Sequence, residues 1–205
     1  MLSRPEADII SRKNTSANRI GKGRQDACGR RNTMKLIEPS LEYEQQIRAY
    51  RQEFLGCGSS MDGTGGLKKY EDIPAWIEAS LRGRDPANVP EGMVPATQYL
   101  FVREEDSKVV GMIQIRHYFN DFLEKYGGHI GYSVAPGERR RGYAAQMLKA
   151  ALPKCRELGL DKVLITCIRG NEGSKRTILK NGGSYESTVY EPDADIYLER
   201  YWINL

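Results

Sequence analysis

The sequence has no long apolar run and few of the residues that usually bind metals. No stretch approaches the roughly 18 to 20 consecutive apolar residues that a membrane-spanning helix requires, so we predict no membrane partner. The first residues lack the apolar core of a secretory signal, and we therefore expect a cytoplasmic protein. The four cysteines follow no metal-binding or redox spacing, which favours unpaired thiols and no metal.

Nucleotide-binding motifs and a uniform positive charge are also missing. There is no G-x-x-x-x-G-K-[ST], and no G-x-G-x-x-G follows a predicted strand. The net charge is +4, but residues 1–33 hold eight Lys or Arg against three Asp or Glu, which leaves a net of −1 for residues 34–205. We therefore predict no nucleic-acid partner, with a module that uses this leader and Arg139 to Arg141 as the alternative.

The chain divides into a leader and one globular domain. Residues 1–33 show no sustained apolar period and are predicted to be a disordered basic extension, with an upstream start, a transit peptide or an interaction tail as alternatives. Residues 34–205 alternate between strand and helix patterns. Strands are predicted at 34–38, 97–106, 108–119, 129–136 and 161–168, a hairpin at 185–205, and helices at 39–56, 70–83, 142–159 and 172–183.

Three consecutive arginines stand at the start of one predicted helix. The strand, helix and strand between residues 129 and 168 form a crossover, which places this helix start beside the carboxyl end of the first strand. A helix start has about four unpaired amides and a partial positive charge, so it favours anions. Gly142 lacks a Cβ, which lets a phosphate approach the backbone. The pattern predicts a phosphate or diphosphate site, with a solvated basic turn as the alternative.

Three ordered motifs resemble the GNAT acetyltransferase superfamily. R-x-x-G-x-A at Arg139, Gly142 and Ala144 is similar to its acetyl-CoA signature, and HIGYSVAP at 129–136 is similar to its central strand. Asn171 and Ser174, followed by a helix that ends in glycine, resemble its second cofactor segment. The match covers about residues 34–205. It implies an α/β (α+β) fold with a mixed, mostly antiparallel sheet and a splayed central parallel strand pair flanked by helices.

The resemblance also implies where acetyl-CoA, as cosubstrate, would bind. The main chain of the turn would hold the diphosphate, and Val134 would offer its main chain to the pantetheine arm. Asn171 and Ser174 would line the arm from the other side, although Asn before a helix is also a common N-cap. The implied binding residues are Val134, Arg139, Arg140, Arg141, Gly142, Tyr143, Ala144, Asn171 and Ser174.

Acetylation of an amine needs a base, and the sequence contains only two histidines. We predict His129 as the base, because it stands where many family members carry the strand glutamate. Strand alternation also places it on the same face as Gly131 and Ser133, small residues that leave room for a ligand. His117 is predicted to lie near His129 and to assist, and a structural role in the sheet is the alternative for both. Many family members carry a tyrosine acid seven residues after the asparagine. Ile178 stands there, so the general acid is unassigned, with Tyr132, Tyr185 or water as the candidates.

The predicted activity is transfer of acetyl from acetyl-CoA to a primary amine of a small molecule or peptide, by direct attack in a ternary complex. A non-catalytic acyl-CoA sensor is the alternative. The acceptor pocket is expected at the first two helices and the link at 118–128, where Glu71 and Asp72 near Trp76 favour a cationic amine. The resemblance also leaves a homodimer open as the oligomeric state, because dimers are frequent in the family.

Overall fold

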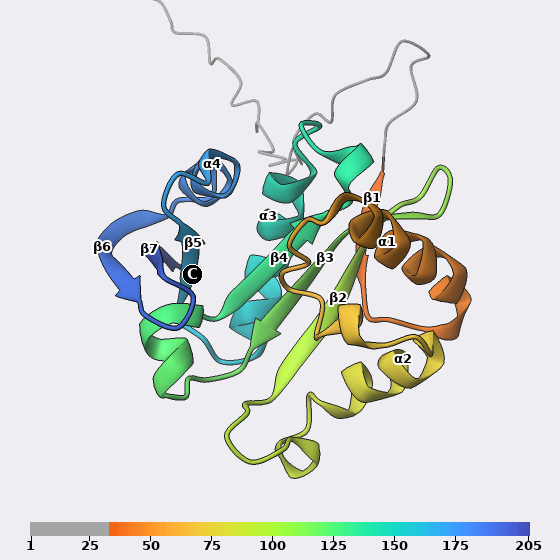
Figure 1. Cartoon of the computed structure of the whole chain (residues 1–205), viewed down its shortest axis with the longest axis horizontal. Coiled ribbons are helices and arrows are strands. Elements are labelled where there is room, and N and C mark those ends of the chain that lie inside the picture. The colour runs from red at the N-terminus through yellow and green to blue at the C-terminus, as the bar shows by residue number, and fades with distance from the viewer. Residues whose placement is uncertain (1–32) are drawn as a thin grey trace, which may run out of the picture. The chain divides into compact units, whose positions relative to one another are not determined.

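A computed structural model describes residues 33–205, so the predicted basic extension lies outside the described residues except for Thr33. The described part contains seven strands and four α-helices, arranged as two sheets with helices packed against them (Figure 1). None of its helices combines the length and the apolar character that crossing a bilayer requires.

The two sheets are built only from antiparallel ladders. The first has the order β1 (Met34–Ile37), β2 (Ala96–Arg103), β3 (Lys108–Arg116) and β4 (Ile130–Val134). The second has the order β5 (Lys162–Ile168), β7 (Ile196–Asn204) and β6 (Ser184–Glu191). Both predicted hairpins, β2 with β3 and β6 with β7, are confirmed.

β4 and β5 are the edge strands at which the two sheets meet. They form no ladder with each other in the described sheets, and the His129 N–H donates to the Leu164 carbonyl at 2.8 Å where they approach. The mixed α/β fold with mostly antiparallel strands is as predicted. The parallel pairing of these two strands stays a prediction.

Strand alternation sorts the side chains of the first sheet into two cores. Tyr99 and Phe101 of β2 face α3 (Tyr143–Glu157), whereas Leu100 and Val102 face α1 (Glu44–Cys57) and α2 (Ile73–Arg82). The short helix α4 (Glu172–Lys180) completes the first core through the buried Ile178. The sheet therefore separates an α3 side from an α1/α2 side, and β4 borders both.

Two boundaries matter for the site. α3 begins at Tyr143 with Gly142 as its N-cap at φ +81°, where the sequence predicted a glycine-led start. The predicted link at residues 119–128 is partly helical, because Leu123–Gly127 form one π-helical turn, η4. The link is therefore a packed segment beside the junction of the two sheets.

Candidate active site

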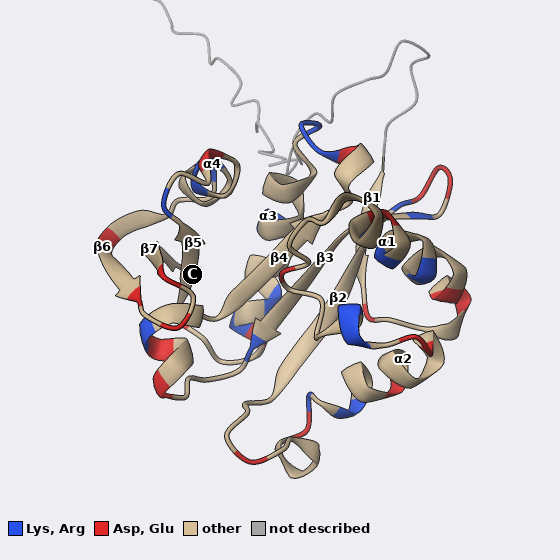
Figure 2. Cartoon of the chain, in the orientation of Figure 1, with Lys and Arg blue, Asp and Glu red and all other residues tan. Residues whose placement is uncertain are grey.

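Two of the three arginines in the basic turn between β4 and α3 contact other residues of the protein. Figure 2 shows the turn as a blue loop next to α3. Arg139 donates from Nε to the Val134 carbonyl at 3.2 Å, and its guanidinium lies 5.5 Å from the centre of the Phe54 ring. Arg141 pairs with Glu138 at 3.1 Å. These contacts hold the backbone of the turn in one conformation, which anion binding through the main chain requires.

Glu138 is a buried carboxylate that binds three cations at once. It accepts from Arg103 at 2.9 Å and from Lys108 at 2.8 Å, in addition to Arg141. Burial alone would raise the pKa of Glu138, but the hydrogen bonds from Arg103 and Lys108 outweigh it and lower this pKa below its ordinary value. The carboxylate stays ionised, so the turn is anchored to the β2–β3 hairpin.

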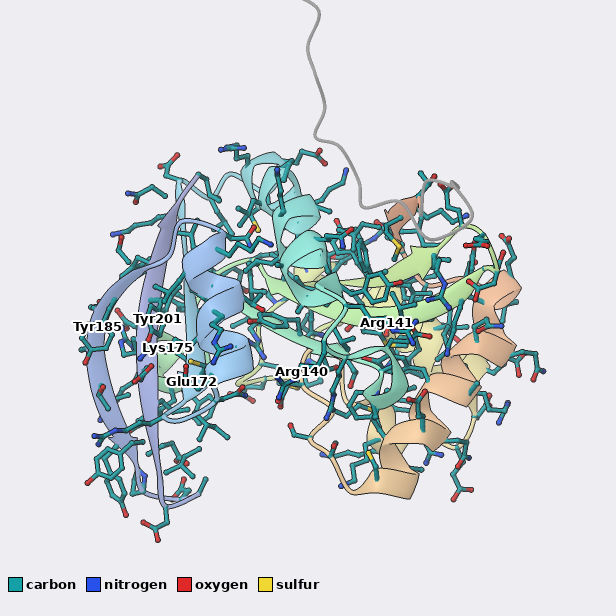
Figure 3. The ribbon with its side chains drawn as sticks, turned by 90° about the horizontal axis from the view of Figure 1, so that it is seen from above. Arg140, Arg141, Glu172, Lys175, Tyr185 and Tyr201 are labelled. Carbon is teal, nitrogen blue, oxygen red and sulfur yellow. The ribbon has the colours of Figure 1, made fainter. Side chains whose placement is uncertain are left out.

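Arg140 and Gly142 form the open part of the turn. Arg140 has no partner within residues 33–205, and Figure 3 shows it on the side of the turn nearer α4, with Arg141 on the other side. Both Arg140 and Gly142 have positive φ angles, of +65° and +81°. A Cβ added to Gly142 would meet only the Gln146 side chain, at 3.9 Å. The main chain of this turn is therefore accessible.

The start of α3 leaves amides for an anion. The first hydrogen bond inside the helix runs from the Gln146 N–H to the Gly142 carbonyl at 3.2 Å, and no side chain caps the helix. The amides of Ala144 and Ala145 have no partner among the described residues. Unpaired amides, the helix dipole and the free Arg140 together fit a phosphate group.

The outer edge of β4 faces the gap between the sheets. Because the Ala135 N–H donates to Val110 of β3, alternation turns the polar main-chain groups of Val134 the other way. The Val134 carbonyl already accepts one hydrogen bond from Arg139, so its N–H is the group left fully free for an extended ligand. This is half of the main-chain contact that a paired strand would make.

α4 supplies the other wall of the gap. The Asn171 side chain accepts from the Ser174 N–H at 3.1 Å, so Asn171 is the N-cap of α4. The Ser174 hydroxyl is hydrogen-bonded to the Tyr132 hydroxyl at 2.9 Å. Burial raises the pKa of Tyr132 to about 12, so its phenol is neutral. A pair of hydroxyls therefore connects β4 to α4.

His129 joins the two sheets. Its Nδ1 accepts from the Leu164 N–H at 2.9 Å, which leaves the proton of the neutral ring on Nε2. Phe119 packs on the ring with the two ring centres 3.9 Å apart. Burial and then the charge of Arg116 lower the pKa of His129 to about 4. This geometry does not support the prediction that His129 is the base, because the neutral ring has no free lone pair.

His117 and His129 are hydrogen-bonded to different strands. The Nε2 of His117 is bonded to the Thr97 hydroxyl of β2 at 2.8 Å, whereas His129 contacts β5. The structure therefore does not support a relay between them. No cluster of three or more His, Cys, Asp or Glu within residues 33–205 could hold a metal ion.

A loop at residues 58–66 fills the space beside Gly131 and Ser133, where the small side chains predicted room for a ligand. The Ser133 hydroxyl donates to the Asp62 carbonyl at 2.6 Å, and a Cβ on Gly63 would lie 2.0 Å from the Gly131 carbonyl. The small residues of β4 therefore accommodate a backbone. The sequence showed this loop as glycine-rich, but nothing in it identified the strand that the loop covers.

The expected acceptor pocket is also only partly present. Trp76 is fully buried and donates to the Thr64 carbonyl. Asp72 caps α2 and lines an open hollow that neither Trp76 nor Glu71 lines. An open hollow of about 800 Å³ lies between α2 and residues 39–42, and one of about 450 Å³ lies between the link and β6. Neither hollow is lined by residues of the turn before α3.

Comparisons with known proteins give the family and the fold of the chain. A profile of the acetyltransferase (GNAT) family matches residues 69–182. No curated protein sequence matches this chain significantly. A microcin C7 self-immunity acetyltransferase, MccE, solved with acetyl-CoA and AMP, is similar in fold, with a TM-score of 0.61 at 15% identity over 84% of this chain and 92% of that chain.

Two further solved structures share the fold at low identity. Mycobacterium smegmatis RimJ in complex with CoA-disulfide has a TM-score of 0.62 at 17% identity, over 83% of this chain and 81% of that chain. A dodecameric spermidine N-acetyltransferase from Vibrio cholerae has a TM-score of 0.56 at 13% identity, over 83% and 93%. The solved structures thus share the fold of this chain, and the family profile gives its class, the acetyltransferases. The chain belongs to the GNAT acetyltransferase family.

Proposed function

We propose that the chain transfers the acetyl group of acetyl-CoA to a primary amine of a small molecule or peptide, by direct attack in a ternary complex. The observation that carries this proposal is the accessible main chain at the start of α3. There the amides of Ala144 and Ala145, the αL glycine Gly142 and the unpaired Arg140 converge. Solved relatives in fold contain acetyl-CoA or CoA-disulfide, which supports the same ligand here.

The chain's own residues divide the work along the gap between the sheets. The turn at residues 139–144 would hold the diphosphate, with Arg139 and Arg141 stiffening it and Arg140 free to pair with a phosphate. The Val134 N–H would bind the arm along the edge of β4. Asn171 acts indirectly, because it caps α4 and so positions Ser174.

Chemistry then requires an amine lone pair and a destination for the negative charge on sulfur. The amine nitrogen attacks the thioester carbon, the C–N bond forms, the C–S bond breaks, and the amine proton leaves to solvent. The neutral hydroxyl pair of Tyr132 and Ser174 can donate a hydrogen bond to the departing thiolate. Water is the proposed base, because the His129 lone pair is occupied.

Titration calorimetry with acetyl-CoA, followed by thiol release with an amine panel, tests the proposal. We expect binding and acceptor-dependent thiol release. Binding without thiol release for any amine would favour the acyl-CoA sensor, and no binding at millimolar acetyl-CoA would overturn both. A nucleic-acid role is disfavoured, because Arg139 and Arg141 already have internal partners.

A further inference from the structure

Polar side chains form a row across three strands on the α1/α2 side of the first sheet. The register places Gln98 of β2 opposite Gln114 of β3, and Gln114 opposite Gly131 of β4. Arg116 follows two residues after Gln114 and so lies on the same face. The rest of this face is apolar core, with Leu100 and Met112 among its residues. A polar row inside an apolar face needs partners.

Gln98 is only partly satisfied. Its Nε2 donates to the Gly63 carbonyl at 3.0 Å and to the Ile113 carbonyl at 3.2 Å, which fixes the amide orientation. Its Oε1 is the single buried side-chain polar atom without a partner in the described part of the chain. Gln98 is 2% exposed, so solvent does not satisfy this oxygen freely. The row therefore contains a buried hydrogen-bond acceptor without a donor among the described residues.

Arg116 carries a charge that no carboxylate neutralises. Its NH1 donates to the carbonyls of Gly127 and Gly128, each at 3.1 Å, and no Asp or Glu of residues 33–205 lies within ion-pair distance. Burial lowers its pKa, and the more distant Asp62 opposes this only in part. The other well-buried arginines are paired, Arg103 with Glu138 and Arg200 with Glu186. Arg116 is the exception.

The row lies beside the point where acetyl would be delivered. The Nη2 atom of Arg116 would lie 3.5 Å from a Cβ added to Gly131, in the middle of β4. Arg116 and Gln114 are half-buried, so a ligand can reach them, whereas the backbone of Gly63 covers Gly131. The loop at residues 58–66 forms the roof, since a Cβ on Gly65 would lie 3.2 Å from Gln98 Oε1 and 3.3 Å from Gln114 Nε2.

We infer that this row is the acceptor subsite and that the acceptor is a small amine bearing a carboxylate, which Arg116 binds. The inference rests on the proposed acetyl transfer at β4. It replaces the expected cationic amine, because the positive charge here belongs to the protein. A guanidinium with free donors recognises a carboxylate through charge-assisted hydrogen bonds.

Matched acceptors test this inference. Alanine and alaninamide share an amine and differ in the carboxylate, and the amide has more free amine at neutral pH, so intrinsic reactivity favours it. We expect the full chain to use alanine with kcat/KM about tenfold or more above alaninamide. Arg116→Gln should erase this preference by raising KM for alanine, with kcat nearly unchanged.

Arg200→Gln is the matched control. Arg200 also donates to two carbonyls of the link, those of Glu124 and Lys125 at 2.6 Å, but it already has Glu186 as its counter-charge. This variant should retain the preference for alanine. If both variants change the preference equally, Arg116 only holds the link in place and the inference falls.

A second variant covers the case that Arg116→Gln does not fold. Gln114→Glu places a carboxylate in the row near Arg116 and should remove the preference for alanine; an unchanged preference would overturn the inference. Calorimetry separates the two proposals. A chain that binds acetyl-CoA and acetylates alaninamide as well as alanine contradicts only the anionic subsite, whereas a chain that does not bind acetyl-CoA contradicts the proposed function.

Discussion

The two faces of β4 are built from alternate residues of one five-residue strand, yet they differ in kind. On the α3 side, Tyr132 and Val134 pack toward the first core, and Tyr132 reaches Ser174 of α4. On the α1/α2 side, Gly131 and Ser133 contact the backbone of the loop at residues 58–66. We propose that one face offers main chain and hydroxyls to acetyl-CoA and that the other offers a charged row to an acceptor.

In that proposal, one edge strand serves two substrates. Neighbouring side chains in a strand point in opposite directions, so each face can be specialised independently. The strand edge, where the Val134 N–H points into the gap, is common to both. Substitutions that act on one face and spare the other therefore test the division.

The largest effect is expected for Gly63→Ala, which attacks the loop face. The new Cβ would lie 2.0 Å from the Gly131 carbonyl, and φ is +67°, so the loop must move. We expect the free energy of unfolding to fall by about 3 kcal/mol in urea titrations. Gly66→Ala is the control, with φ +76° and open space, and should lose about 1 kcal/mol. Equal losses would show that the contact with β4 is unimportant.

A pH effect of similar size is expected at His129, where both faces begin. Its pKa is about 4 in the folded chain and 6.5 ordinarily, so between these values the unfolded chain binds a proton that the folded chain does not. Stability is complete above pH 6.5 and falls by about 3 kcal/mol as the pH drops toward 4.

Urea unfolding across this pH window measures the effect. His129→Asn keeps an acceptor for the Leu164 N–H without titrating, and it should flatten the pH dependence. His117→Asn should leave most of it, although burial lowers the pKa of His117 as well. If His129→Asn instead leaves the slope unchanged and removes turnover, the structural role assigned here is wrong and the catalytic prediction stands.

Gly142→Ala probes the phosphate turn on the α3 side. A Cβ would stand where the main chain is expected to contact phosphate, and we expect acetyl-CoA affinity to fall about tenfold to a hundredfold in calorimetry. Gly159→Ala at the other end of α3 has φ +80° and open space, so it matches the backbone strain. Similar affinity losses in both variants would mean that the turn does not bind the coenzyme.

Tyr132→Phe should have the smallest effect. Loss of the hydroxyl removes a donor to the thiolate, so kcat should fall about tenfold while acetyl-CoA affinity stays constant. The control is Tyr185→Phe. Tyr185 is 57% exposed, and its hydroxyl is hydrogen-bonded to the Thr188 hydroxyl. An unchanged kcat for Tyr132→Phe would leave Ser174 or water to stabilise the thiolate.

Local pattern was sufficient for the elements and for the turn. The spacing of Met147, Leu148, Ala151 and Cys155 predicted α3, because one face of a helix must be buried, and all four are. Gly142 and the arginines marked its start. The role of Asn171 as cap or ligand stayed open, and its bond to Ser174 now gives it the capping role.

Side-chain roles at β4 were less predictable. The histidine assignment relied on the family's glutamate position and on alternation, which gives a face and says nothing of what occupies it. Loop 58–66 fills that face, and Leu164 takes the His129 lone pair from a strand 35 residues away. No sequence pattern marked Arg116, because a single arginine at the end of a strand is ordinary. Only the structure shows that it has no carboxylate as an ion-pair partner among the described residues.

The sequence by itself determined the order of strands and helices, the glycine-led start of α3 and the family signature, because periodicity and turn chemistry act over a few neighbouring residues. Only the tertiary structure decided which arginines are neutralised, which histidine nitrogen is free and what covers each face of β4. Charge pairing and hydrogen-bond satisfaction depend on partners brought together from distant parts of the chain, and no local pattern records those partners.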